Sequence, residues 1–250
     1  MANSLAGKKI VIVGGTSGMG FAVAKFSLLD HAGEVVVASS KKDNVDGAVA
    51  RLNAIIAEHK LSGKVEGAVV DAGDAESIKA LMTKVGELDH LVWTAMGDIS
   101  KGFPGNNPDE QRGIFDIKFW GAATAVQVAK FRPGGSLTQT SGTVLLRPQA
   151  KQSLLCGAAG ALDGLTRGLA VDLAPVRVNV VAPGLVQTEF WDKMPMPQAQ
   201  KDMLYEQYKN KLLLKHIANA DEVADAFLFC MKCRYLTGQR IVVDGGLVLI

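Results

Sequence analysis

The chain has 250 residues, with 27 Lys and Arg residues against 25 Asp and Glu, so its formal net charge at pH 7 is +2. This near-neutral balance provides no strong field for a nucleic acid or an anionic membrane, and 48% hydrophobic residues exclude a disordered chain. We expect no membrane span, since no apolar run reaches about 18–20 residues, and no signal peptide. Three cysteines, a sparse and odd number, argue against a disulfide framework and predict a reducing, cytoplasmic location.

Short β-branched runs alternate with longer helical patterns along the whole chain. In chain order, we expect strands at Lys9–Val13, Glu34–Ala38, Lys64–Val70, Asp89–Trp93, Gly135–Gln139, Val176–Val181 and Arg240–Val243. We expect helices between them at 18–31, 43–60, 74–86, 108–130, 152–173 and 219–232. Uniformly apolar strands that alternate with helices predict an α/β fold: a Rossmann-like, doubly wound parallel sheet of about seven strands with helices on both faces.

No linker divides this pattern, so we predict a single domain over residues 1–250. One stretch interrupts the alternation: residues 189–215 have helical character but lie between the sixth strand and the last helix. An insertion at the carboxyl end of a strand is the expected place for a substrate lid.

The first strand runs into a glycine-rich loop and then a helix. Glycines at these positions let the backbone turn sharply and approach a pyrophosphate, which the free N–H groups of the helix N-terminus would bind. The strand–loop–helix context is what makes this motif specific. The predicted contacts are Gly14, Thr16, Ser17, Gly18, Met19 and Gly20.

The end of the second strand indicates which dinucleotide binds. An acidic residue there would bind the ribose 2′-hydroxyl of NAD, but this chain has Ser39, Ser40 and Lys41, which suit the 2′-phosphate of NADP. Asp71, followed by Ala72, ends the third strand and can accept a hydrogen bond from the adenine amino group. A solvated basic loop and a helix N-cap are the plainer interpretations of these two segments.

Four segments carry motifs typical of one family. Residues 13–20 (VGGTSGMG) resemble its TGxxxGxG loop, with Val13 in the threonine position, and 163–179 resemble its helix-to-strand segment. Residues 183–188 (PGLVQT) resemble its PGxxxT loop, and 237–246 resemble its closing TGxxxxxDGG. By these motifs the chain resembles the short-chain dehydrogenase/reductase family over nearly its whole length.

The resemblance implies further contacts to NADP. The backbone and the threonine of the PGxxxT loop would hold the nicotinamide amide and a phosphate, and the segment after the fourth strand would line the same crevice. The implied residues are Pro183, Gly184, Val186, Thr188, Thr94, Ala95 and Met96, in addition to Asp71.

The catalytic half of the family pattern is different. The family uses a tyrosine and a lysine in YxxxK to move a proton while hydride passes between nicotinamide and a carbonyl or alcohol carbon. The corresponding positions here are Leu155 and Ala159, and the only tyrosines are Tyr205, Tyr208 and Tyr235. The resemblance therefore predicts a member that lacks this pair, with proton transfer arranged in another way.

Two other residues are candidates for catalysis. Ser141 ends the fifth strand near the family's serine position, although it could be a simple turn residue beside Gly142. Lys118 stands where the family has an asparagine, on an apolar helix where a lysine needs a partner. It could resupply the ammonium lost at Ala159 and bind the nicotinamide ribose, or it could be a surface lysine whose charge reaches solvent.

No metal site is expected, because the histidines are scattered and the Cys230/Cys233 pair has no second pair or histidine neighbour.

We predict an NADP(H)-dependent oxidoreductase that acts on a small organic carbonyl, imine or alcohol. The alternatives are a cyclase or isomerase without net redox and a non-catalytic NADP(H)-binding protein. The apolar helices at 108–130 and 152–173 predict a homodimer or homotetramer, since the family forms a dimer seam there.

Overall fold

The predicted parallel sheet is present in the computed structural model, which describes residues 4–97, 102–191 and 197–250. Its strands lie side by side in the order β3-β2-β1-β4-β5-β6-β9, and every neighbouring pair is parallel. The strands are β1 (Lys9–Val13), β2 (Glu34–Ser39), β3 (Lys64–Val69), β4 (Glu87–Trp93), β5 (Lys130–Thr140), β6 (Arg177–Pro183) and β9 (Arg240–Val243). The order reverses between β1 and β4, and this switch point opens a crevice at the carboxyl ends of the strands.

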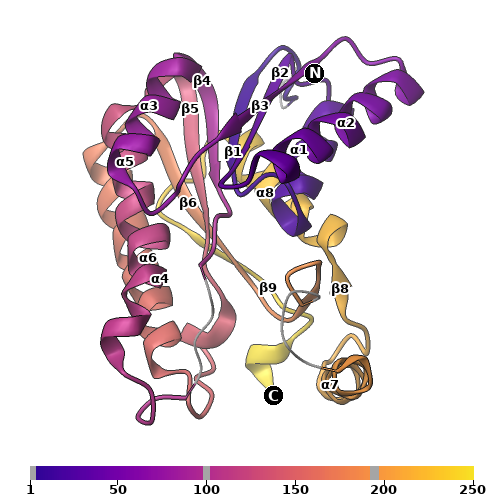
Figure 1. The fold of residues 1–250 in the computed structure, drawn as a ribbon, viewed down its shortest axis with the longest axis vertical. Coiled ribbons are helices and arrows are strands. Elements are labelled where there is room, and N and C mark those ends of the chain that lie inside the picture. The colour runs from indigo at the N-terminus through magenta and orange to yellow at the C-terminus, as the bar shows by residue number, and fades with distance from the viewer. Residues whose placement is uncertain (1–3, 98–101, 192–196) are drawn as a thin grey trace.

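Helices cover both faces of this sheet (Figure 1). One layer holds α1 (Gly18–Leu29), α2 (Lys42–His59) and α8 (Ala220–Lys232), and the other holds α3 (Ala75–Val85), α4 (Arg112–Phe115), α5 (Gly121–Val128) and α6 (Ser153–Asp172). The predicted fold class is therefore confirmed.

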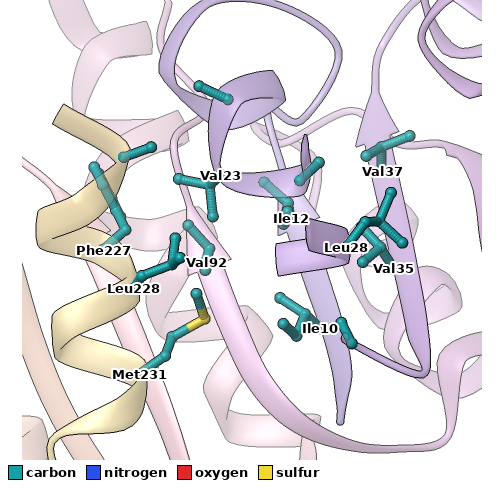
Figure 2. Close-up of a cluster of buried hydrophobic side chains, with 14 of the residues drawn as sticks. Ile10, Ile12, Val23, Leu28, Val35, Val37, Val92, Phe227, Leu228 and Met231 are labelled. Atoms are coloured by element: carbon teal, nitrogen blue, oxygen red, sulfur yellow. The ribbon is translucent and has the colours of Figure 1, made fainter. Parts of the chain in front are cut away.

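Two apolar clusters hold these layers to the sheet. Ile10 and Ile12 of β1 pack with residues of α1 and α8 such as Val23 and Phe227 (Figure 2). The alternate β1 residues, including Val11, belong to the cluster on the opposite face. Because successive side chains of a strand point to opposite faces, a strand covered on both sides must be apolar at every position. This explains the unbroken apolar runs of the sequence.

Strand β5 is longer than the predicted Gly135–Gln139. It already begins at Lys130, and its pairing with β4 shifts register between Leu88 and His90. Pro133 and Gly134 lie in this stretch, and Gly134 has a φ of +82°. Proline and glycine suggested a turn before the strand, but they instead form part of an irregularity within it, as is usual for these residues at a β-bulge.

The single helix predicted at 108–130 is a composite that ends at Val128. A 3₁₀ turn (Pro108–Gln111) and α4 lead into a π-helical turn (Asp116–Trp120), which is followed by α5. At the π-turn, the indole N–H of Trp93 donates to the carbonyl oxygen of Ile117 at 3.0 Å. A wider turn frees backbone carbonyl groups from the helix, so an inserted side chain can satisfy them.

The predicted insertion at about 189–215 contains a helix of its own, α7 (Gln198–Lys211). It lies outside both helical layers, beside the carboxyl terminus (Figure 1). A short parallel pair, β7 (Val186–Gln187) and β8 (Ala218–Asn219), joins the two ends of this segment. The insertion thus leaves and rejoins the fold at one place.

Helix α6 bears on the expectation that no segment spans a membrane. By length and composition it could cross a membrane, and it is the one such helix among the residues that the structure describes. In the structure α6 packs along β6, and its Asp163 is ion-paired with Arg240 at 2.9 Å and with Arg167 at 3.2 Å. A helix that packs against a sheet passes the same test, so the finding is weak evidence for a span.

The outer face next to α5 and α6 generates a prediction about assembly. Trp120 is 61% exposed and Val171 is 77% exposed, which leaves large apolar side chains uncovered in the single chain. We expect a homodimer through this face, and Trp120→Glu should shift the protein to a monomer in sedimentation velocity at micromolar concentration. Tyr235→Glu, at an exposed aromatic residue outside this face, is the matched control and should leave the dimer intact. A monomeric unmutated protein would contradict the prediction.

Candidate cofactor and active site

A cavity of about 780 Å³ lies at the carboxyl ends of the sheet strands. Every residue that the sequence nominated for the cofactor or for catalysis lines it. They are Gly14, Thr16, Ser17, Gly18, Met19, Gly20, Ser39, Ser40, Lys41, Asp71, Ala72, Thr94, Ala95, Met96, Lys118, Ser141, Pro183, Gly184, Val186 and Thr188. The fold therefore brings together segments that are more than 170 residues apart in the sequence.

The glycine loop fits a pyrophosphate. Gly14 has a φ of +89°, and a Cβ atom there would lie 2.5 Å from the Ala95 nitrogen, so only glycine allows this close approach of the backbone. At Gly20 a Cβ atom would lie 2.2 Å from the Gly14 carbonyl oxygen. Helix α1 has no acidic residue in its first turn, and its N-cap, Ser17, makes no side-chain capping bond. The N-terminus of α1 is thus built to receive an anion from outside the helix.

The basic segment after β2 has one lysine suited to a 2′-phosphate. Lys42 is engaged with Asp46, with its Nζ 2.5 Å from the carboxylate, on the exposed side of α2. Lys41 precedes α2, lines the cavity and has no ion-pair partner within the described parts of the chain. The N-terminus of α2 adds a positive dipole end beside Lys41.

Asp71 is not the N-cap of α3. The N-cap of α3 is Asp74, which accepts a hydrogen bond from the Ser77 N–H at 2.8 Å. Asp71 precedes this cap and accepts from the Gly73 N–H at 2.9 Å through Oδ1. The capping interpretation therefore applies to Asp74, and Asp71 lies at the cavity wall.

Lys118 lies fully inside the protein, at the wall of the cavity. Its Nζ donates to the carbonyl oxygen of Thr140 at 3.0 Å, at the end of β5. Burial lowers the pKa of this ammonium from 10.5 to about 8, because removal from water disfavours the charged form. The π-turn that contains Lys118 places it here, and the alternative of a surface lysine is wrong.

The residues around Lys118 are mostly uncharged. Ser141 donates through Oγ to the Ala159 carbonyl oxygen at a long 3.4 Å. Leu155 and Ala159, at the positions of the family's tyrosine and lysine, also line the cavity. Among the described residues that line it, the other ionisable side chains are Lys41, Asp71 and Tyr208. The ammonium therefore has no charged neighbour on its own wall.

The part of the cavity beyond Ser141 is apolar with a polar rim. At the rim, the Gln149 amide donates to the Tyr208 hydroxyl at 2.9 Å and accepts from the Gln152 amide at 3.0 Å, which connects α7 to the start of α6. None of the sequence motifs indicated the further members of this wall. They are Gln149, Leu162, Leu185, Phe190, Trp191, Leu204 and Leu247.

Arg132 and Cys230 do not belong to the cavity lining. Arg132 pairs with Asp89 at 3.2 Å, at the amino ends of the strands. Cys230 is buried, and burial raises the pKa of its thiol to about 12, which keeps it protonated and unreactive. Within residues 4–97, 102–191 and 197–250, no group of three or more His, Cys, Asp or Glu side chains could hold a metal ion.

The comparisons with known proteins agree with this geometry. The family model for the SDR-like Rossmann domain matches residues 1–250. The chain belongs to the short-chain dehydrogenase/reductase family. A curated relative, the short-chain dehydrogenase/reductase ucsE of an Acremonium species, is 35% identical and covers 98% of this chain and 97% of its own.

Solved structures of this family share the whole fold. The MalC reductase/Diels–Alderase of Malbranchea aurantiaca superposes with a TM-score of 0.91 at 27% identity and covers 100% of both chains. A short-chain dehydrogenase from Burkholderia cenocepacia J2315, solved in complex with NADP, has a TM-score of 0.83 at 27% identity and covers 97% of this chain and 98% of its own.

The segment at Lys41 generates a prediction on cofactor choice. We expect the protein to bind NADP more tightly than NAD, and Lys41→Asp should remove the preference by deleting one charge-assisted phosphate contact, worth roughly 1.5–3 kcal/mol. Isothermal titration with both dinucleotides measures this difference. Lys42→Asp is the matched control, because the Lys42 side chain is paired with Asp46. Equal affinities in the unmutated protein would contradict the assignment.

The burial of Lys118 generates a prediction on stability. Because the folded state has the lower pKa, the unfolded state holds more protons between pH 8 and 10.5, so stability rises with pH across this window. Below pH 8 the full burial cost remains, so Lys118→Met should raise the free energy of unfolding at pH 7 by about 2 kcal/mol. The gain should shrink as the pH approaches 10.5. Denaturant unfolding at several pH values measures it, with Lys84→Met, at an exposed lysine, as control; destabilisation at pH 7 would overturn the argument.

Proposed function

We propose that this protein is an NADP(H)-dependent oxidoreductase that transfers hydride to or from a small organic carbonyl, imine or alcohol. The observation that carries the proposal is the position of Lys118. A buried ammonium that can exchange its proton near neutral pH lies at the wall of a cavity whose other end fits a dinucleotide phosphate. Perturbed ionisable groups at such positions are typical of catalytic sites.

The family and the residues that line the cavity support NADP(H) as the cofactor. The glycine loop and Thr188 would hold the pyrophosphate, Ser39, Ser40 and Lys41 the 2′-phosphate, and the loop from Pro183 the nicotinamide. A small-chain dehydrogenase in complex with NADPH shares this fold with a TM-score of 0.80 at 28% identity. When bound, NADPH supplies a hydride; the protein must orient the acceptor and handle the proton.

Lys118 is the group that we assign to the proton. Its Nζ is anchored on the Thr140 carbonyl oxygen, next to Ser141 at the end of the same strand. In a reduction, the ammonium would release its proton toward the oxygen or nitrogen of the substrate, and Ser141 Oγ would steady that atom. A pKa of about 8 suits this task, since general acid catalysis is most effective when the pKa is near the working pH.

The side chains that stand in place of the family's tyrosine and lysine indicate the class of substrate. Leu155 and Ala159 put apolar side chains where the family has a tyrosine and a lysine, so an alkoxide that forms there has no phenol to protonate it. An iminium carbon is already activated and needs no acid, which makes imines attractive substrates. A carbonyl would depend on Lys118. The apolar walls formed by Leu155, Leu162 and Leu204 favour a largely hydrophobic substrate in either case.

A second function is favoured by one comparison. The MalC structure, which superposes on the whole chain, is described as a reductase and a Diels–Alderase. An apolar cavity that can fold a substrate into a reactive conformation would support cyclisation without net redox. A third function, binding of NADP(H) without catalysis, would leave Lys118 with no chemical task. We also expect a cytoplasmic location, in keeping with the three free thiols.

The experiment that separates these functions follows two quantities at once. NADPH oxidation and substrate loss are measured with a panel of ketones, aldehydes, cyclic imines and dienes. We expect NADPH oxidation with at least one C=N or C=O class. Lys118→Met should lower the rate of carbonyl reduction more than the rate of iminium reduction. Substrate turnover without NADPH loss would indicate the cyclase, and no turnover of any class would indicate a binding protein.

Simple ketones provide a separate prediction. Because Lys118 would have to act in place of the tyrosine and lysine pair, we expect their reduction to be slower than in members that have the pair, by up to about 10²–10⁴-fold, the usual range for a general acid. Leu155→Tyr combined with Ala159→Lys should raise the rate, because both side chains would enter the cavity. Leu155→Phe with Ala159→Met fills the same space without ionisable groups and is the control. If the unmutated protein reduces ketones at ordinary family rates, the account of the missing pair is wrong.

A further inference from the structure

Glu189 places a carboxylate on the glycine loop. It directly follows Thr188, and its Oε2 accepts a hydrogen bond from the Gly18 N–H at 2.8 Å. Gly18 is the first residue of α1, and a Cβ atom added there would lie only 3.3 Å from Thr188 Cβ. A segment at the start of the lid insertion is therefore packed directly against the helix end that fits the pyrophosphate.

The carboxylate of Glu189 lies where a capping side chain of α1 would lie. Helix α1 has no acid in its own first turn, and Ser17 does not cap it through its side chain. Glu189 thus supplies the negative charge that the N-terminus of α1 attracts. The cofactor's pyrophosphate needs the same helix end, and two anions there would repel each other.

A second partner for the carboxylate lies beside the first. Arg51 Nη1 is 4.0 Å from Glu189 Oε1. The guanidinium is held in place, because its Nη2 donates to the Thr16 carbonyl oxygen at 2.8 Å and its plane lies over the Phe21 ring, 3.9 Å from the centroid. The side chains of Arg51 and Glu189 are both about half exposed, so the carboxylate has room to move between its two partners.

We propose that Glu189 is a resident anion that the cofactor displaces. In the free protein it binds the Gly18 amide; when the pyrophosphate of NADP(H) takes that helix end, the carboxylate moves onto Arg51. Glu189 then weakens cofactor binding, and Arg51 reduces the cost of the exchange. Because Glu189 begins the lid insertion, the exchange links the phosphate site to the lid. The proposal rests on the dinucleotide alone and does not depend on which reaction follows.

Direct binding measurements test the first step. Glu189→Gln keeps the size of the side chain and removes its charge, so we expect the Kd of NADPH, followed by its fluorescence, to fall about fivefold, as one helix-end charge interaction predicts. Adenosine 2′-monophosphate lacks the pyrophosphate, and its Kd should stay unchanged. Glu76→Gln is the matched control: it removes an equivalent carboxylate from the first turn of α3, outside the cavity lining. An unchanged or weaker affinity of Glu189→Gln for NADPH would overturn the proposal.

A double-mutant cycle tests the role of Arg51. Arg51→Met alone should weaken NADPH binding, because the displaced carboxylate loses its partner, whereas in the Glu189→Gln background the same change should have little effect. Equal effects in both backgrounds would show that Arg51 acts without Glu189 and would overturn the exchange. Glu189→Asp is a second variant: its shorter side chain cannot keep the Gly18 contact, so hydrogen exchange at the start of α1 should rise in the free protein. Unchanged exchange there would also count against the proposal.

Discussion

Both faces of the sheet are covered by helices, and this leaves one place for polar chemistry. Side chains that point up or down from β1 enter an apolar cluster in either direction, as Ile10 and Val11 show. Polar groups can gather where the backbone leaves the sheet, and at the switch point the carboxyl ends of the strands present amide groups and polar side chains to a common cavity. The glycine loop, the loop at Pro183 and the end of β5 meet there for this reason. The position of the site is thus a consequence of how the core is buried.

Within that site, the buried ammonium of Lys118 has a cost that the fold does not offset with an opposite charge. Among the residues that the structure describes, its Nζ donates to a backbone carbonyl group and pairs with no carboxylate, and burial alone lowers its pKa. A buried lysine with no carboxylate partner is rarely a device for stability. It is better explained as a group held ready to lose and regain a proton, in a cavity whose neighbouring wall residues, Leu155 and Ala159, cannot do so. The π-turn that aims Lys118 inward also belongs to this arrangement.

The parts of the site that could be predicted from the sequence are those whose geometry is local. The glycine loop and the hydroxyls after β2 each follow a strand directly, so their place at its carboxyl end is determined by a few residues. The rim could not be predicted in this way, because Gln149 and Leu204 line the same cavity only through tertiary packing. The π-turn was missed because helical periodicity hardly changes when one turn widens. The early start of β5 was hidden by Pro133 and Gly134, which indicate a turn as readily as a bulge.

We infer that Lys118 holds an exchangeable proton at the cavity wall. Nuclear magnetic resonance of carbon-13-labelled lysine side chains tests it without a known substrate, since the Lys118 resonance is identified by its loss in Lys118→Met. We expect this resonance to titrate near pH 8, and we expect NADPH to change its midpoint. A Lys118 that titrates near 10.5 and does not respond to NADPH would contradict the account.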